Sequence, residues 1–337
     1  MITVKISHSP WPLIRQTPGQ KGVWGECRFF FSGMDIDRYD YWFVLEGPGK
    51  KKETSVCPKE NVVFIAHEPP TLKTYKSEFL HQFAAVITSD SHIDHPRPIL
   101  QQSGLPWHIG RRQRNHVNIE FSKDYDELKA MTLIPKTKLL SVVSSSKAMT
   151  EGHSKRLEFA KRLKAHFGDK IDLFGRGLNE IEDKWDALAD YRYHVAIENS
   201  EVNHYWTEKL SDAFLAGCHP IYHGCPNITD YFPPGALTMI SIHEPERAIA
   251  AIEACIGQNR FESSQPLIWE AREKVLDVYN MFPLIADYIA KDRERSPGEN
   301  RPPVKVTIRK EPSESNLIYK FKKTFFAAQA GRRKNPR

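Results

Sequence analysis

The chain lacks any hydrophobic run long enough to cross a membrane. No stretch of the sequence approaches the roughly 20 consecutive apolar residues that a spanning helix needs. The first residues, Met1 to His8, are typical of a first β-strand and do not have the pattern of a secretory signal. We therefore expect a cytoplasmic protein. No internal repeat is visible, which argues against a solenoid or an array.

Cysteine is also scarce. The five cysteines are odd in number and have no repeated spacing, so we expect free thiols and no disulfide framework. The densest group is Cys218, His219, His223 and Cys225. In a strand, successive side chains point to opposite faces, so these four cannot easily close a tetrahedral zinc site. A core strand is favoured here, with zinc as the alternative.

Acidic residues are missing from the end of the chain, where none lies between Ile318 and Arg337. The formal net charge is +6, and removing the seven cationic side chains of this segment leaves 6 − 7 = −1. The basic character therefore belongs to the tail, whose seven cations are Lys320, Lys322, Lys323, Arg332, Arg333, Lys334 and Arg337.

The tail also has an apolar helical face, formed by Leu317, Ile318, Phe321, Phe325 and Ala328. A basic amphipathic helix suits an anionic membrane surface, which would make the protein peripheral on the inner face of the cytoplasmic membrane. The alternative is that the phenylalanines pack back on the rest of the chain. Nucleic-acid binding is not expected, because the aromatic and basic residues largely occupy different faces and no known module is present.

The remaining length and composition fit two α/β domains. A chain of 337 residues with 40% hydrophobic content is sufficient for two cores. Short apolar runs alternate with loops and helices, as in α/β domains. We predict an N-terminal α/β domain over residues 1–135, a second over 136–295, and a linker and basic tail over 296–337. Expected strands include 4–6, 41–45, 62–66, 84–88 and 193–197, and residues 304–308 could form an edge strand.

A polar cluster follows the run from Tyr193 to Ile197. Glu198, Asn199 and Ser200 come at the carboxyl end of this predicted strand, where α/β sheets usually bind ligands. Thr207 can cap a helix that Gly217 closes.

That cap places Glu208 and Lys209 in the first turn of the helix. A helix N-terminus carries partial positive charge, so a lysine there favours a bound phosphate. The alternative is that Glu208 and Lys209 are ordinary solvated charges.

Four blocks between residues 198 and 235 occur in one order: Glu-Asn-Ser, Tyr-x-Thr-Glu-Lys-Leu, Ala-Gly-x-x-Pro-Ile and Asn-x-x-Asp-Tyr-Phe-Pro-Pro-Gly. Together they resemble the donor-binding core of the α-1,3/4-fucosyltransferases, glycosyltransferase family 10. Golgi members of this family start with a membrane anchor, and because the sequence has no such apolar stretch we expect a bacterial-type member. The resemblance implies the fold called GT-B, in which two Rossmann-like domains face each other across a cleft. GDP-fucose would bind to the C-terminal domain and the acceptor to the N-terminal one.

The resemblance also assigns residues. In the family a helix arginine binds the donor diphosphate, and Arg156 is the matching candidate, although basic neighbours on the same helix leave an ordinary surface role open. The general base follows an N-terminal strand, which points to Glu68. The donor set is completed by Glu198, Asn199, Tyr205, Thr207, Glu208 and Lys209. Glu208 would accept hydrogen bonds from sugar hydroxyls, and Asn199 would donate and accept toward the nucleotide sugar.

The chemistry implied is inverting transfer of fucose to a glycan hydroxyl. One base is sufficient for it, while Arg156, Lys209 and helix N–H groups neutralise the leaving diphosphate. No metal cofactor is required, although divalent cations could stimulate the reaction. The Asp-x-Asp pattern at Asp35 and Asp37, which holds Mn²⁺ in many other glycosyltransferases, is more typical of a turn here.

The acceptor implied by the resemblance is N-acetylglucosamine or glucose within an oligosaccharide or lipopolysaccharide. Only the surroundings of Glu68 match the family in the first half of the chain, and His67 departs from the residues often found before the base. Two alternatives therefore stay open. One is the same chemistry with another GDP-deoxyhexose or GDP-hexose, and the other is a non-catalytic sugar-binding relative.

Overall fold

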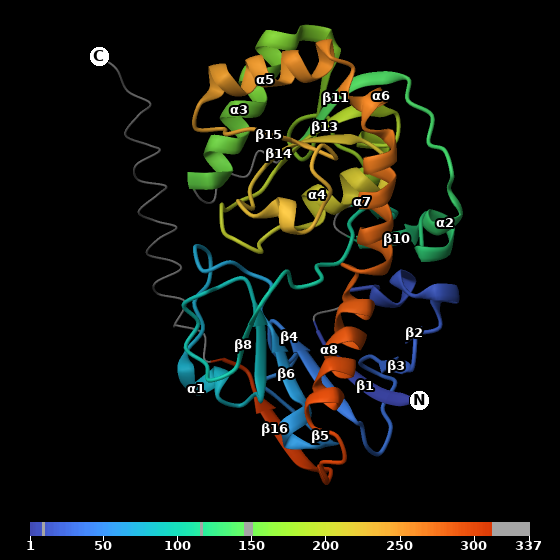
Figure 1. The fold of residues 1–337 in the computed structure, drawn as a ribbon, viewed down its shortest axis with the longest axis vertical. Coiled ribbons are helices and arrows are strands. Elements are labelled where there is room, and N and C mark those ends of the chain that lie inside the picture. The colour runs from blue at the N-terminus through green and yellow to red at the C-terminus, as the bar shows by residue number, and fades with distance from the viewer. Residues whose placement is uncertain (9–10, 115–116, 145–150, 312–337) are drawn as a thin grey trace.

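The chain folds into two α/β units, each built around a mostly parallel sheet (Figure 1). The computed structural model describes residues 1–8, 11–114, 117–144 and 151–311. The predicted tail over 317–337 lies outside these residues. Within them, no helix has the length and hydropathy needed to span a membrane.

The first sheet has seven strands in the order β2-β3-β1-β4-β6-β7-β8, and only β2 and β3 pair antiparallel. Its central strands β4 and β6 are buried along their whole length, which explains why they are continuous apolar runs. The strands are β1 (Ile2–Ser7), β2 (Val23–Trp24), β3 (Cys27–Phe30), β4 (Tyr41–Leu45), β6 (Val62–Ile65), β7 (Ala85–Thr88) and β8 (Pro98–Leu100).

The second sheet is wholly parallel and has five strands in the order β12-β11-β13-β14-β15. Both of its faces are covered. One face packs on α3 (Glu151–Phe167) and α5 (Pro245–Gly257), and the other on α4 (Glu208–Leu215) and α7 (Gln265–Asp277). The strands are β11 (Lys138–Val143), β12 (Ile171–Phe174), β13 (Tyr191–Ile197), β14 (His219–His223) and β15 (Thr238–Met239).

The two units exchange chain segments. The helix α8 (Met281–Arg295) follows α7 but returns to the first unit, where Phe282, Ile285 and Ile289 pack on β1 and β4 (Figure 1). The strand β16 (Val304–Arg309) pairs antiparallel with β5 (Lys52–Cys57), so the edge strand expected near residues 304–308 is confirmed. This packing differs from the predicted division, in which residues up to 295 form the second unit. An apolar helix face does not reveal from sequence which sheet it covers.

Smaller elements complete the described chain. The strands β9 (Arg111–Arg114) and β10 (Val117–Phe121) form a separate antiparallel pair. The short α-helices are α1 (Ser77–Leu80), α2 (Tyr125–Ala130) and α6 (Arg260–Ser263). Turns of 3-10 helix occur at Leu13–Gln16, Pro18–Gln20, Lys59–Asn61, Gly168–Lys170, Lys184–Ala187 and Ile228–Asp230. All five cysteines are buried free thiols, as expected.

The carboxyl edges of the two sheets face each other. The loop after β6 and the loop after β13 meet directly, because the hydroxyls of Thr71 and Ser200 are 2.5 Å apart. Ligands of parallel α/β sheets bind at such edges, so the fold brings two binding edges together. This is the GT-B arrangement that the family resemblance implies.

Candidate active site

The segment after β13 organises the start of α4. The buried carboxylate of Glu198 accepts hydrogen bonds from the Thr207 backbone N–H at 2.8 Å and from the Thr207 hydroxyl at 2.7 Å. Thr207 is the N-cap of α4, as predicted, and its hydroxyl accepts from the Lys209 N–H. Glu198 therefore fixes the position and direction of the helix N-terminus. Tyr205 is buried beside it, and burial raises the pKa of its phenol.

The first turn of α4 presents an ion pair. Lys209 Nζ lies 3.1 Å from Glu208 Oε1, 3.1 Å from Thr207 Oγ1 and 3.6 Å from Glu198 Oε2. Burial alone would lower the pKa of Lys209, but the carboxylates of Glu208 and Glu198 outweigh it and raise the pKa. Burial likewise opposes ionisation of Glu208, yet Lys209 and His108 hold its pKa well below the ordinary value. Both side chains stay charged.

Arg156 comes to the same place from α3. Its side chain is buried, and its Nη1 donates to Asn199 Oδ1 at 2.7 Å. Arg156 Nε and the nearby Ser144 Oγ are both buried and have no hydrogen-bond partner among the residues that the structure describes. Buried polar groups are normally satisfied, so these two atoms are ready to bind a polar ligand. Burial lowers the pKa of Arg156, which nevertheless remains a cation at any physiological pH.

These groups surround a cavity of about 230 Å³ at the carboxyl edge of the second sheet. Arg156, Glu208 and Lys209 line it, together with Ser144 and Lys184. Asn199 is bonded to Arg156, which lines the cavity. Glu198 and Thr207 do not line it, and they bond to each other at the N-terminus of α4. Four cationic side chains line this small cavity beside a helix N-terminus, namely Arg156, Arg176, Lys184 and Lys209. Such a lining favours a diphosphate or a similar anion.

The cavity depends on a close backbone approach at Gly175, which has a φ of +125°. A Cβ at this position would lie 1.8 Å from the Ser144 carbonyl oxygen. Only glycine therefore lets the turn after β12 lie against the end of β11, where Ser144 enters the cavity.

Glu68 projects from the first unit, in the loop after β6. Burial raises the pKa of its carboxyl, Glu46 raises it further, and Lys73 and Lys209 oppose the shift. Glu68 lies in the loop that also carries Thr71, whose hydroxyl contacts Ser200 of the second unit. The structure thus places the predicted base three positions before a contact between the two units.

Glu46 is a residue that sequence reasoning missed. It follows β4 with a φ of +61°, and its carboxylate accepts four hydrogen bonds. Two come from the backbone N–H groups of His67 and Glu68, and two from Lys73 and Tyr75. The available signal was a carboxylate directly after an apolar strand, the position that also singled out Glu198.

Two further site residues were missed because they lie far away in the sequence. His108 Nδ1 is 3.8 Å from Glu208 Oε1, and its ring packs on Trp11 at a centroid distance of 4.9 Å. Lys184 Nζ binds Asp212 at 2.8 Å and the Glu208 carbonyl oxygen at 3.2 Å. No local motif marks either residue.

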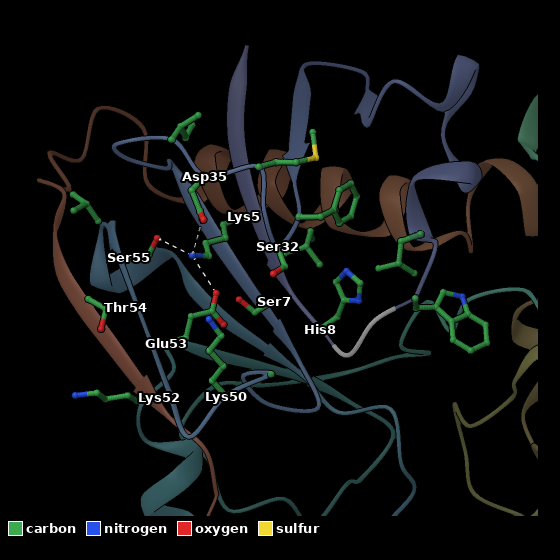
Figure 2. A pocket seen from close by; sticks show the side chains of 18 of the residues that line it. Lys5, Ser7, His8, Ser32, Asp35, Lys50, Lys52, Glu53, Thr54 and Ser55 are labelled. Carbon is green, nitrogen blue, oxygen red and sulfur yellow. Dashed lines mark hydrogen bonds and ion pairs between the residues drawn. The ribbon is translucent and has the colours of Figure 1, made fainter. Parts of the chain in front are cut away.

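A second cavity of about 1110 Å³ lies along β1 in the first unit (Figure 2). At one end Lys5 Nζ contacts Ser55, Glu53 and Asp35 at 3.2, 3.1 and 3.7 Å. Asp35 is therefore paired with a lysine, and it lies in an irregular segment just after a turn at residues 32–33. At the other end Trp11 lines the cavity and packs on His108, so this cavity adjoins the smaller one.

The zinc alternative for the Cys218 group is wrong. Cys218 Sγ donates to the Leu188 carbonyl oxygen at 3.1 Å. Both ring nitrogens of His219 are engaged, with Ser264 at 2.8 Å and Thr238 at 2.9 Å. Cys218 and His219 are therefore engaged separately, and among the described residues no metal-ligating group contains Cys218, His219 or Cys225.

Comparison with known proteins gives partial matches. Residues 133–282 match the family model described as glycosyltransferase family 10 (fucosyltransferase) C-term. An α-(1,4)-fucosyltransferase of Arabidopsis thaliana is 34% identical over 27% of this chain and 24% of its own length. GDP-fucose protein O-fucosyltransferase 3 of Danio rerio is 28% identical over 29% of this chain and 21% of its own length. The chain thus matches about a quarter or less of each of these two relatives.

A solved α1,3-fucosyltransferase structure is 15% identical. It aligns over 83% of this chain and 91% of its own with a TM-score of 0.48.

Proposed function

Residues 133–282 of this chain match the family model of glycosyltransferase family 10, and we propose that the protein belongs to this family and transfers fucose from GDP-fucose to a hydroxyl of a glycan. The observation that carries the proposal is the cavity beside α4, where Arg156 and Lys209 converge with a helix N-terminus. Such a site suits the diphosphate of a nucleotide sugar. Glu68 lies in the loop after β6, which meets the segment after β13 through Thr71 and Ser200, so the proposed base comes from the opposite unit.

The proposed step is a single displacement. Glu68 takes the proton of the acceptor hydroxyl while that oxygen attacks the anomeric carbon of fucose. The bond from this carbon to the β-phosphate oxygen breaks on the opposite face, so the configuration inverts. The raised pKa of Glu68 brings its proton affinity closer to that needed by a base near neutral pH.

The leaving GDP gains negative charge, and the site is arranged to receive it. Arg156 offers a buried N–H, Lys209 offers its ammonium, and the N-terminus of α4 adds its partial positive charge. Groups held in place before the reaction stabilise such charge most effectively. Glu198 contributes indirectly, because it holds Thr207 and therefore the helix.

The cavity along β1 is proposed to receive the acceptor glycan, with N-acetylglucosamine or glucose as the accepting sugar. It combines hydroxyl and charged side chains, including Ser7, Ser32 and Lys50, with the apolar surfaces of Trp11 and Met34 (Figure 2). Sugars present both hydroxyls and apolar faces, so a lining of both kinds suits them. Filling this cavity with Ser32→Trp should raise the acceptor KM while leaving GDP affinity unchanged.

The basic segment 317–337 is proposed to bring the protein to an anionic membrane surface, on the cytoplasmic side, where a lipid-linked acceptor such as a lipopolysaccharide precursor would be found. Its support is the charge pattern of the sequence, since each Lys or Arg near anionic lipid contributes about 1 kcal/mol.

Calorimetry of the full chain with GDP, UDP and CMP tests the donor class. GDP should bind most tightly, and tighter binding of UDP or CMP would refute the donor assignment. Hydrolysis of a panel of GDP-sugars then tests fucose against other GDP-hexoses, because donor hydrolysis needs no acceptor. GDP-fucose should be hydrolysed fastest.

A further inference from the structure

Two imidazoles and a carboxylate converge at the carboxyl edge of the second sheet, outside the lining of the donor cavity. Glu201 follows β13, His223 ends β14, and His243 follows β15. One ligand atom of each lies within 4.8 Å of the others. His243 Nε2 is 2.6 Å and His223 Nε2 is 3.6 Å from Glu201 Oε1. Among the described residues, no other set of three or more metal-ligating side chains converges in this way.

His223 is already oriented as a ligand. Its Nδ1 lies 3.4 Å from the Ile240 carbonyl oxygen, a long hydrogen bond that favours the proton on Nδ1. The Nε2 lone pair then points toward Glu201 and His243. Metal-binding histidines commonly use their second nitrogen in this way.

We propose that Glu201, His223 and His243 bind a divalent transition-metal ion, with Zn²⁺ as the best match. Two imidazoles and one carboxylate form a three-ligand set that Zn²⁺ accepts, with water in the fourth position. Tetrahedral Zn²⁺ with bonds near 2.0–2.2 Å places its ligand atoms about 3.4 Å apart. The 3.6 Å pair fits this spacing, and the 2.6 Å pair must open slightly. His243 and Glu201 are 47% and 43% exposed, so they have room to move.

Ca²⁺ and Mg²⁺ do not fit this set. Both cations prefer oxygen ligands, and only one of these three side chains supplies oxygen. The competing explanation is an ordinary surface ion pair between His243 and Glu201. The chain provides a direct comparison, because His166 and Glu253 form such a pair at 2.8 Å, and no third ligand joins them among the described residues.

A bound metal would tie together the loops that follow three adjacent strands. Glu201 directly follows Ser200, which contacts Thr71 of the other unit, and lies three positions after Glu198, which holds α4. The metal would therefore fix the segment that joins the donor cavity to the contact between the units. Its role is structural, and binding does not depend on the proposed sugar transfer.

Metal binding can be measured without any assay of activity. Full-length protein without a histidine tag, stripped with a chelator, is titrated with Co²⁺ and then with Zn²⁺. We expect one Co²⁺ per chain with the visible absorption of a low-symmetry site, displacement by one Zn²⁺, and a rise in Tm with Zn²⁺. His243→Ala and Glu201→Gln should each weaken Zn²⁺ binding at least tenfold.

His166→Ala is the matched control and should leave the affinity unchanged. Circular dichroism confirms that each variant is folded. If His243→Ala unfolds, the test depends on Glu201→Gln alone, because that substitution changes the shape of the side chain least. The proposal is overturned if the stripped protein binds no Zn²⁺, or if both cluster variants bind it as tightly as the parent chain. Loss of binding in His166→Ala instead would assign the ion to the surface pair and would also overturn it.

Discussion

Glu46 Oε1 lies 3.2 Å from the backbone nitrogen of Glu68 and accepts its hydrogen bond. The same oxygen accepts from His67 N–H and from the Tyr75 hydroxyl, while Lys73 binds the other oxygen. A carboxylate after β4 therefore sets the loop from which the proposed base projects. Glu46 is a positioning residue, because it acts on the reaction through Glu68.

Glu68→Gln should lower turnover by about 10²-fold or more, the usual contribution of a positioned general base. GDP affinity should change little, since Glu68 lies in the opposite unit from the donor cavity. Steady-state kinetics with GDP-fucose and calorimetry with GDP measure the two quantities separately. Undiminished turnover in this variant would remove Glu68 from the mechanism.

The pH profile of the parent enzyme should show the raised pKa of Glu68. A general base works only when deprotonated, so activity falls as the pH drops through this pKa. Because burial and Glu46 raise the pKa, the acid limb should lie above the pH range of an ordinary glutamate. An acid limb at or below the pH range of an ordinary glutamate would contradict the raised pKa of Glu68.

Glu46→Gln should separate positioning from simple stability. The amide oxygen can still accept hydrogen bonds, but the negative charge that raises the Glu68 pKa is removed. The acid limb of kcat should therefore move to lower pH, while kcat at the plateau falls through poorer placement of Glu68. If Glu46 had a purely structural role, the variant would contain less folded enzyme but its acid limb would stay at the same pH. An unchanged acid limb would therefore contradict the proposed effect of Glu46 on Glu68.

Several features of the site could be predicted from the sequence. The strand before Glu198, the cap at Thr207 and the helix that carries Arg156 depend on local patterns, and all three are present. Ligands of α/β sheets bind at the carboxyl ends of the strands, and this placed Glu198 and Lys209 near one predicted ligand site. What made these predictions succeed is that each depends on residues close together in the chain.

Other features depend on how distant segments pack. His108 reaches Glu208 across 100 positions, and α8 returns to the first sheet, neither of which has a local signal. Glu198 was predicted to touch the donor, yet both its oxygens bind Thr207. A carboxylate can either bind the donor or hold Thr207, and only the three-dimensional arrangement decides between these two partners.

Arg156→Ala should weaken GDP binding by roughly 10- to 100-fold, the range expected for losing hydrogen bonds between a cation and phosphate. Lys209→Ala should act in the same direction. The matched control is Arg162→Ala on the same helix, whose side chain is exposed and pairs with Glu158 and Glu246. Calorimetry with GDP compares the three variants, and equal losses for Arg156 and Arg162 would indicate a general charge effect.

Removal of residues 317–337 should reduce cosedimentation with anionic liposomes, because the segment contributes seven cations. Binding to neutral liposomes should be weak for both forms, and added salt should release the full-length chain. GDP affinity serves as the control for an intact donor site. If the truncated chain sediments with anionic liposomes as well as the full chain does, the membrane role of the tail is wrong.

Breaking the contact between Thr71 and Ser200 should lower the free energy of unfolding, because this bond joins the two units. Thr71→Val and Ser200→Ala each remove one hydroxyl of a pair that lies 2.5 Å apart. If the two hydroxyls bond only to each other, the double variant should lose less free energy of unfolding than the two single variants lose together. The difference, which is the coupling energy, should be about 0.5–1.5 kcal/mol. Urea denaturation of the four proteins measures this coupling. Additive effects would mean that the two hydroxyls are satisfied independently and that this bond does not hold the carboxyl edges together.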